Sequence, residues 1–162
     1  MPLYMRAVVI REKALGPEHP DVATSLNDLA IVYFYQGRHA EAQPLLARAL
    51  AIREKALGPD HPDVAFSLNN LGNVYLRQGH YAESEPLHMR ALAIREKALG
   101  PDHPDVAYCL NGLALTFRDQ GRYQEAEGLL SQALSTREAA LGSDHPLTKS
   151  TREALDTLRS RE

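Results

Sequence analysis

Histidines are the residues whose spacing most directly suggests chemistry in this chain. Four of them recur at intervals of 42 residues: His19, His61, His103 and His145. Imidazole is a common zinc ligand, and each ligand of one zinc ion lies about 2 Å from the metal. Packed helices lie about 8–10 Å apart, so equivalent histidines on them cannot share an ion. The other histidines lack cysteine or carboxylate partners at ligand spacing: His39, His80 and His88. We therefore expect no metal site and no cofactor.

Three of the four recurrent histidines begin the tripeptide His-Pro-Asp, at 19–21, 61–63 and 103–105. This tripeptide matches the signature of chaperone J-domains. Here it recurs where a helix is expected to begin, because proline suits the first helical position and aspartate in the first turn meets the positive end of the helix dipole. We interpret it as a turn and helix cap.

The only cysteine is Cys109, so the chain forms no intrachain disulfide and has no cysteine cluster for zinc. Cys109 precedes the apolar Leu110, and no nearby cation in the sequence would activate a thiol. A packed thiol is expected. The sequence contains no glycine-rich phosphate loop and no serine-centred nucleophile elbow. We therefore expect that the chain is not an enzyme.

Composition narrows the class of protein. The 162 residues are 44% hydrophobic and 24% charged, with a net charge of −3, which is typical of a folded soluble domain. No run of about 18 apolar residues could span a bilayer, and the first residues do not resemble a signal peptide. We expect a cytoplasmic protein. The balanced charge gives no reason to expect nucleic acid or a membrane as partner.

The whole chain is organised by a period of 42 residues. Residues 7–48 and 49–90 are identical at 27 of 42 positions, and such self-similarity indicates a repeat architecture. In one unit, apolar residues at steps of four, three and four predict a first helix: Val64, Leu68, Leu71 and Tyr75. It begins at Pro62 and ends at Gln78-Gly79. A second helix follows and ends at Leu99-Gly100, with Pro86 a mild irregularity in its early turns.

One helical hairpin cannot bury its apolar face alone, so the hairpins must stack. We expect one repeat domain, 1–162, with eight helices. Residues 1–16 form an orphan second helix, residues 17–58, 59–100 and 101–142 form three hairpins, and residues 143–162 form a capping helix. In that last helix Arg152 replaces the core leucine of the other repeats, as suits a solvated end.

These residues carry a family resemblance. Leu71-Gly72, followed by Tyr75, Gly79, Tyr81, Ser84 and Ala91, resembles the tetratricopeptide signature. The usual repeat has 34 residues, and the longer linker here is similar to that of kinesin light chain repeats. The resemblance implies an all-α fold, a right-handed α-solenoid of stacked antiparallel helical hairpins, whose first helices line a concave groove. It also implies a protein or peptide partner.

A stripe on the first helices, distinct from the core stripe, is the predicted peptide-binding site. Its candidate residues are Asn27, Tyr35, Phe66, Asn69, Asn70, Asn73, Arg77, Tyr108, Asn111 and Arg118. Asparagine amides offer a donor and an acceptor to an extended peptide, and the aromatic rings offer apolar anchors. Alternatively, the recurrent asparagines only hydrogen-bond the neighbouring helix. Arginines and carboxylates both occur along the stripe, which leaves the charge of the ligand open.

Two other functions compete with peptide binding. The orphan first helix exposes Leu3, Val8 and Val9, so the chain could be a self-associating scaffold, a homo-oligomer joined through that helix. It could also be the regulatory or sensor segment of a larger signalling ATPase or protease. The Arg-Glu pairs that recur on second helices, such as Arg53-Glu54 and Arg137-Glu138, are interpreted as a solvated charged face.

Overall fold

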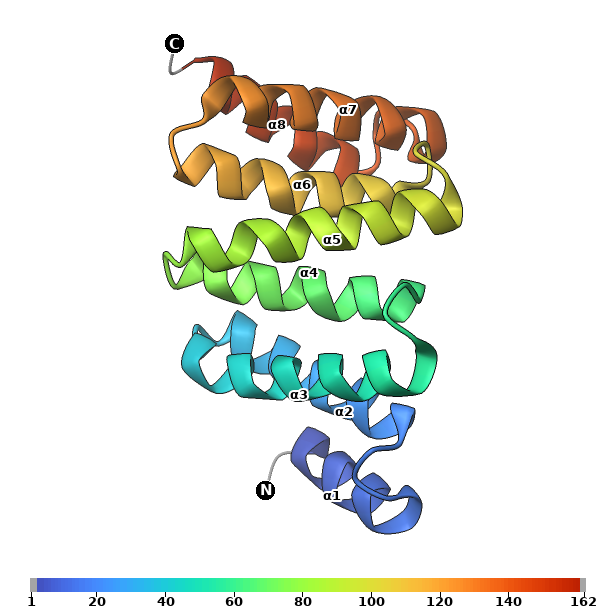
Figure 1. Cartoon of the computed structure of the whole chain (residues 1–162). Helices are drawn as coiled ribbons and strands as arrows, with labels where there is room; N and C mark the ends of the chain where they lie inside the picture. The colour runs from blue at the N-terminus through green and yellow to red at the C-terminus, as the bar shows by residue number, and fades with distance from the viewer. Residues whose placement is uncertain (1–2, 161–162) are drawn as a thin grey trace. The chain divides into compact units, whose positions relative to one another are not determined.

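The computed structural model describes residues 3–160, which form eight α-helices and no strand (Figure 1). The helices are α1 (Leu3–Leu15), α2 (Pro20–Tyr35), α3 (His39–Leu57), α4 (Pro62–Arg77), α5 (Tyr81–Leu99), α6 (Pro104–Asp119), α7 (Tyr123–Leu141) and α8 (Pro146–Arg159). First helices are α2, α4, α6 and α8, and second helices are α1, α3, α5 and α7. The fold is an all-α helical-repeat solenoid, and the predicted number of helices is confirmed for the described residues.

The chain divides into two compact units, Met1–His80 and Tyr81–Glu162. Unit 1 holds α1 to α4 and unit 2 holds α5 to α8. Inside each unit every helix packs against the next one along the chain, α1 on α2, α2 on α3 and α3 on α4, and correspondingly α5 on α6, α6 on α7 and α7 on α8. Each unit therefore consists of a second helix, a complete hairpin and a first helix.

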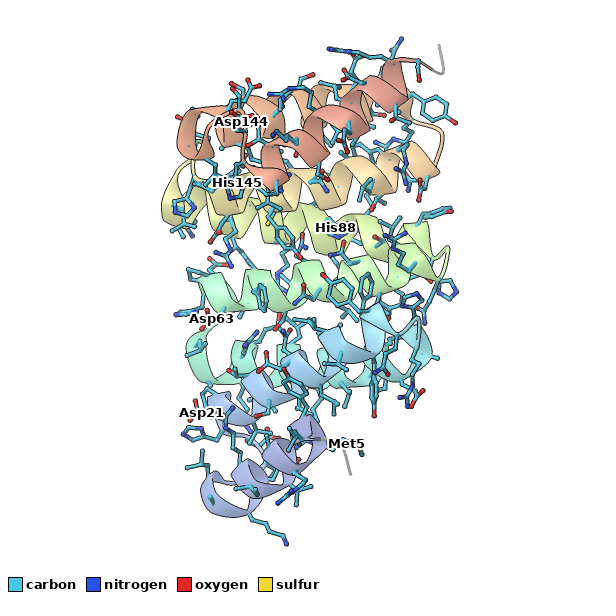
Figure 2. All side chains as sticks on the ribbon, turned by 180° about the vertical axis from the view of Figure 1, so that it is seen from behind. Met5, Asp21, Asp63, His88, Asp144 and His145 are labelled. Atoms are coloured by element: carbon cyan, nitrogen blue, oxygen red, sulfur yellow. The ribbon has the colours of Figure 1, made fainter. Side chains whose placement is uncertain are left out.

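Each first helix begins with a histidine cap. His61 is extended (φ −72°, ψ 141°), and its Nδ1 accepts a hydrogen bond from the backbone N–H of Asp63 at 3.1 Å. The same bond forms at His19, His103 and His145. Figure 2 shows Asp21 and Asp63 at the same edge of unit 1, where α2 and α4 begin. The His-Pro-Asp tripeptide therefore acts as a helix start, as predicted, and its histidine supplies the acceptor.

Glycines with a positive φ mark the ends of the helices. Gly79, directly after the C-cap residue Gln78, has a φ of 78°, a left-handed conformation that only glycine adopts without strain. Gly58, which ends α3, has a φ of 88°. Pro86 lies inside α5, which continues unbroken from Tyr81 to Leu99. This confirms that an early-turn proline is only a mild irregularity.

Apolar clusters hold each unit together. The unit 1 cluster comprises Val8, Val22, Ala23, Leu26, Leu29, Ala49 and Ile52, with Met5, Tyr33 and Leu45 packed against it. The expected exposure of Val8 was wrong, because its side chain packs into this cluster and is 7% exposed. One unit 2 cluster comprises Leu113, Ala114, Phe117, Ala126, Leu130, Leu155 and Leu158, and another comprises Val106, Ala107, Leu110 and Ala133. The predicted core stripe of the first helices therefore packs against second helices.

The prediction of a solvated Arg-Glu face was wrong for the arginines of α3 and α7. Arg53 and Arg137 are 6% and 4% exposed. Nη1 of Arg53 donates to Oγ of Ser67 at 2.7 Å, and Nη1 of Arg137 donates to Oγ1 of Thr151. Their long apolar stems allow the guanidinium groups to cross from one repeat to the next.

Candidate functional site

The exposed face of α2 carries residues at steps of four, three and four: Thr24, Asp28, Ile31 and Tyr35. Tyr35 is 83% exposed, and its ring meets the edge of Phe34 with centroids 5.7 Å apart. Asp28 and Ile31 are half-buried. In unit 1 this stripe presents one aromatic ring, one aliphatic side chain and one carboxylate to solvent.

The equivalent stripe of α4 is less exposed. Phe66 and Asn73 are half-buried and Arg77 is exposed. The guanidinium carbon of Arg53 lies 5.8 Å from the centroid of the Phe66 ring, within the range of a cation–π interaction. This contact holds the ring of Phe66 in place beside its exposed neighbours.

The predicted ladder of asparagines is mostly interior. Asn27 and Asn69 are each 1% exposed, and Asn70 is 8% exposed. Nδ2 of Asn70 donates to Oδ1 of Asn27 at 3.2 Å, so these two residues join α2 to α4, which is the alternative considered from the sequence. Neither amide atom of Asn69 has a hydrogen-bond partner in the described part of the chain, at a typical cost of about 1–3 kcal/mol. Of the three asparagines that recur at intervals of 42 residues, Asn27, Asn69 and Asn111, only Asn111 on α6 is partly exposed.

Unit 2 presents a corresponding stripe on α6. Tyr108 is 42% exposed, and Asn111 and Leu115 are half-buried. Arg118 is held by Asp119, with Nη2 and Oδ1 2.7 Å apart. Between α6 and α8 lies a hollow of about 220 Å³, lined by Arg118, Ser150, Glu153, Ala154, Thr157 and Leu158.

Two residues of that hollow were missed by sequence reasoning, although the period could have found them. Ser150 and Thr157 stand 42 residues after Tyr108 and Leu115, and both are exposed. Arg152 stands 42 residues after Leu110, and this polar residue at a core position was interpreted as a sign of a solvated end of the array. The exposed stripe nevertheless continues on the adjacent face of α8, the helix that carries Arg152.

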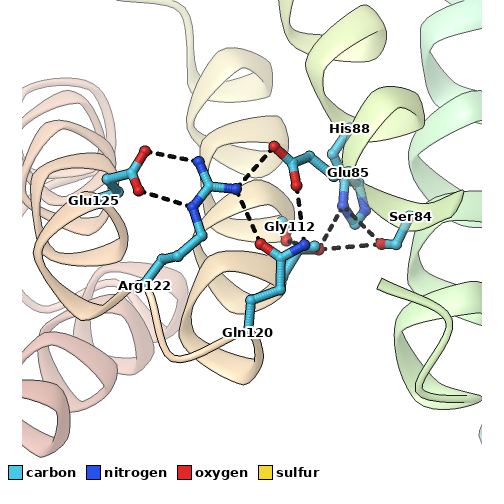
Figure 3. Close-up of polar contacts among 8 residues, drawn as sticks. Ser84, Glu85, His88, Gly112, Gln120, Arg122 and Glu125 are labelled. Carbon is cyan, nitrogen blue, oxygen red and sulfur yellow. Dashed lines mark hydrogen bonds and ion pairs between the residues drawn. The ribbon is translucent and has the colours of Figure 1, made fainter. Parts of the chain in front are cut away.

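A polar cluster between α5 and α6 was also missed (Figure 3). Nδ1 of His88 lies 3.0 Å from Oγ1 of Thr116 and 3.3 Å from Oγ of Ser84. All three side chains are fully buried. His88 stands where the other hairpins have Leu46 and Leu130. The Ser–His pair is therefore closed to a substrate and links α5 to α6.

The lone thiol lies in the core. Cys109 is 2% exposed, and burial raises its pKa to about 11, although the positive charge of Arg95 opposes the shift. The fold does bring one cation, Arg95, near enough to act on the thiol, but its charge does not offset the effect of burial, so the thiol is not activated, as predicted. Nη1 of Arg95 pairs instead with Oδ2 of Asp105 at 2.5 Å. The thiol is packed, as predicted.

Two other kinds of site, a metal site and a membrane-spanning helix, were searched for in the described part of the chain. Within residues 3–160 no three or more histidine, cysteine, aspartate or glutamate side chains are grouped so that they could hold a metal ion. No helix in the same range is long and apolar enough to cross a membrane. The exposed surfaces of the first helices remain the candidate site.

Stacked helical hairpins that present polar and aromatic side chains from their first helices define a protein–protein interaction module. The family model of the tetratricopeptide repeat matches residues 2–55, 21–97, 68–139 and 112–155. The chain belongs to the tetratricopeptide repeat family. No curated protein matches it at a significant level of similarity.

Solved structures support the same assignment. A Podosopora anserina protein described as a kinesin light chain with nearly identical TPR-like repeats is 31% identical, with a TM-score of 0.80, covering 98% of this chain and 74% of that chain. BtubC (BKLC) from P. vanneervenii is 23% identical (TM-score 0.84; 98% of this chain, 63% of that chain). The Sgt2 TPR domain from Aspergillus fumigatus is 18% identical (TM-score 0.64; 86% and 78%). The last two share the fold, and the 42-residue repeat is of the kinesin light chain-like type.

Proposed function

We propose that the chain binds extended peptide segments of a partner protein along the exposed stripes of its first helices, one stripe in each unit. The observation that carries this proposal is the exposure of Tyr35 in unit 1 and Tyr108 in unit 2, which are 83% and 42% exposed on these stripes. A rigid aromatic side chain in solvent is a typical interaction anchor, because it buries a large area and loses little rotamer entropy.

The surroundings of these two rings give the proposed site its polar contacts. In unit 1, Asn73 offers an amide donor and acceptor on α4, and Arg77 offers a cation. In unit 2, Asn111 offers the amide donor and acceptor, and Arg118 in the adjoining hollow offers the cation. A peptide backbone presents N–H and C=O groups that such amides can pair with, whatever its side chains are.

The buried asparagines have a different proposed part. Asn27 and Asn70 bond to each other and fix the spacing of α2 and α4, so they position the surface that the peptide contacts. Asn69, with its unbonded amide, supports the stripe from within. Each unit also carries both charge signs, Asp28 with Arg77 and Asp119 with Arg118, so a ligand of low net charge fits best.

Peptide display against the purified chain, followed by calorimetric titration of a selected peptide, tests this proposal. Tyr35→Ser combined with Tyr108→Ser is expected to weaken binding at least tenfold, because the stripe of each unit loses its aromatic anchor. Asn73→Ala combined with Asn111→Ala is expected to weaken it less, while far-UV circular dichroism stays unchanged.

A matched control is Tyr123→Ser. Tyr123 is 41% exposed at the start of α7, off the stripe, so its loss should leave the affinity unchanged. Peptides that bind the double tyrosine variant as tightly as the parent chain would rule out the proposed site.

A further inference from the structure

The hollow between α6 and α8 is formed entirely within unit 2, because all the residues that line it belong to these two first helices. Its volume is about 220 Å³, below the roughly 300–1,000 Å³ of a site that encloses a whole small molecule. The hollow therefore has room for a single side chain of a larger ligand, such as a bound peptide.

The equivalent place in unit 1 shows what kind of group belongs there. Between α2 and α4, Nδ2 of Asn70 donates to Oδ1 of Asn27 at 3.2 Å, and both side chains are buried. Two periods of 42 residues later stand Asn111 on α6 and Ala154 on α8. Ala154 lines the hollow and has no amide to offer to Asn111, which is half-buried. The hollow therefore takes the place of an amide side chain that unit 1 supplies itself.

The polar groups around the hollow include both a donor and acceptors. Nε and Nη2 of Arg118 each lie 2.7 Å from Oδ1 of Asp119, so Nη1 is the nitrogen left to donate to a ligand. Oγ1 of Thr157 donates to the backbone carbonyl of Glu153 at 2.7 Å, which leaves the lone pairs of this hydroxyl and the exposed carboxylate of Glu153 as acceptors. A bound group therefore meets a donor from α6 and acceptors from α8.

Charge and polarity limit the choice of occupant. An ammonium group in the hollow would lie beside the guanidinium of Arg118, and a carboxylate would lie beside that of Glu153, so each would meet a like charge. An aliphatic side chain would displace water from these polar groups and give them no partner in return. A primary amide is neutral and carries both donors and an acceptor, so it satisfies both walls.

We propose that the hollow between α6 and α8 binds the side-chain amide of a glutamine or asparagine in the partner peptide. The amide oxygen accepts from Nη1 of Arg118, and the amide nitrogen donates to the carboxylate of Glu153. Asn111 is the third contact, by analogy with Asn27 in unit 1. This inference rests on the proposed binding of peptides by the first helices, and it specifies one residue of the peptide bound by unit 2.

A display library of random short peptides tests the inference. It is selected against the full chain carrying Tyr35→Ser, so that the stripe of unit 2 is the intact one. The selected peptides are expected to share a glutamine or asparagine at one position. In calorimetric titration of one such peptide, replacing that residue by leucine, glutamate or lysine should weaken binding at least tenfold, because the polar groups of the hollow lose their partner.

The most direct variant of the chain is Ala154→Asn, because the new amide can bond to Asn111 as in the unit 1 pair and fills the hollow. It should keep the circular dichroism and thermal stability of the parent and lose at least tenfold in affinity for the peptide. Glu153→Leu, at an exposed position, removes the acceptor without altering the core and should weaken binding severalfold. The matched control is Ala140→Asn, the same substitution at an exposed alanine of α7, which should leave the affinity unchanged.

Failure of this inference can be told apart from failure of the proposed function. Selected peptides that share no amide residue, or that bind the Ala154→Asn chain as tightly as the parent, overturn the amide site and leave peptide binding standing. Tighter binding of the leucine or the lysine peptide also overturns it, because the occupant is then apolar or basic. If the library yields no binding peptide, both proposals fail.

Discussion

Nη1 of Arg53 on α3 donates a hydrogen bond to Oγ of Ser67 on α4 at 2.7 Å. The same nitrogen donates to the backbone carbonyl of Asp63 at 3.3 Å. Burial lowers the pKa of Arg53, and the negative charges of Asp63 and Asp28 oppose that shift. The buried guanidinium of Arg53 therefore joins a second helix, α3, to α4, the first helix of the next repeat. Its hydrogen bonds offset the free-energy cost of removing the charge from water.

Replacing Arg53 by leucine is the direct test of this joint. Arg53→Leu keeps the apolar stem but leaves the hydroxyl of Ser67 and the carbonyl of Asp63 without their donor. The free energy of unfolding is expected to fall by about 2 kcal/mol, measured by urea denaturation. Arg77→Leu, an exposed arginine on α4, is the control and should change stability by less than about 0.5 kcal/mol. Equal stability of Arg53→Leu and the parent chain would contradict the argument.

Cys109 allows the complementary experiment, because it lies in the next repeat at the position equivalent to Ser67. With a thiol there, Arg95 turns to the carboxylate of Asp105. Cys109→Ser restores the hydroxyl acceptor, and the chain is expected to gain up to about 1 kcal/mol of stability.

A double-mutant cycle with Arg95→Ala separates the new bond from other effects. The cost of Arg95→Ala should be larger in the serine background than in the parent chain. Cys109→Ala, which adds no acceptor, serves as the matched control and should show no such increase. An unchanged cost of Arg95→Ala would mean that the serine hydroxyl is not used.

The local features of the fold could be predicted from the sequence. Gly79 ends α4 with a positive φ and Pro62 begins it, and both effects depend only on the residue's own backbone. The core stripe of Val22, Leu26 and Leu29 follows from helical spacing alone. Such features need no knowledge of which other segment lies nearby.

Features that depend on the neighbouring helix were harder to foresee. Periodicity places Asn27 beside the stripe, but only the approach of α4 buries it, through Asn70. Arg53 is charged, and charged residues are mostly exposed. It is nevertheless buried, because Ser67 on the neighbouring helix accepts its hydrogen bond. The sequence did contain a signal for this bond, because an arginine and a hydroxyl residue recur 14 positions apart, as at Arg11 and Ser25.

The histidine cap provides a third prediction. His61→Ala removes the acceptor for the backbone N–H of Asp63 and should cost about 1 kcal/mol of unfolding free energy. His61→Asn supplies a side-chain oxygen at the same position and should recover most of that loss, since asparagine is a good N-cap residue. The measurement is thermal or urea unfolding of both variants. If the two lose the same stability, the imidazole acts by packing and not as a cap.

The carboxylate of Glu85 makes stability depend on pH. Its Oε2 accepts from Nε2 of Gln120 and its Oε1 from Nη1 of Arg122, both at 2.9 Å (Figure 3). The hydrogen bond from Gln120 and then that from Arg122 lower the pKa of Glu85 below its usual value of 4.5. The folded chain therefore holds this proton more weakly than the unfolded chain. The resulting stabilisation is fully present above the unfolded pKa and is lost as pH falls through the folded pKa.

Glu85→Gln should remove this dependence. Because the carboxylate is half-buried and its ion pair remains partly solvated, the parent chain should be more stable than the variant by about 0.5–1 kcal/mol at neutral pH, and the difference should shrink as the pH falls through the lowered pKa of Glu85. Urea unfolding at several pH values measures it. The matched control is Gln43→Ala, since Gln43 occupies the same position in unit 1 and accepts from Gln78 without a charge. Its cost should be independent of pH, and a Glu85→Gln difference that stayed constant down to pH 3 would show that Glu85 acts through packing alone.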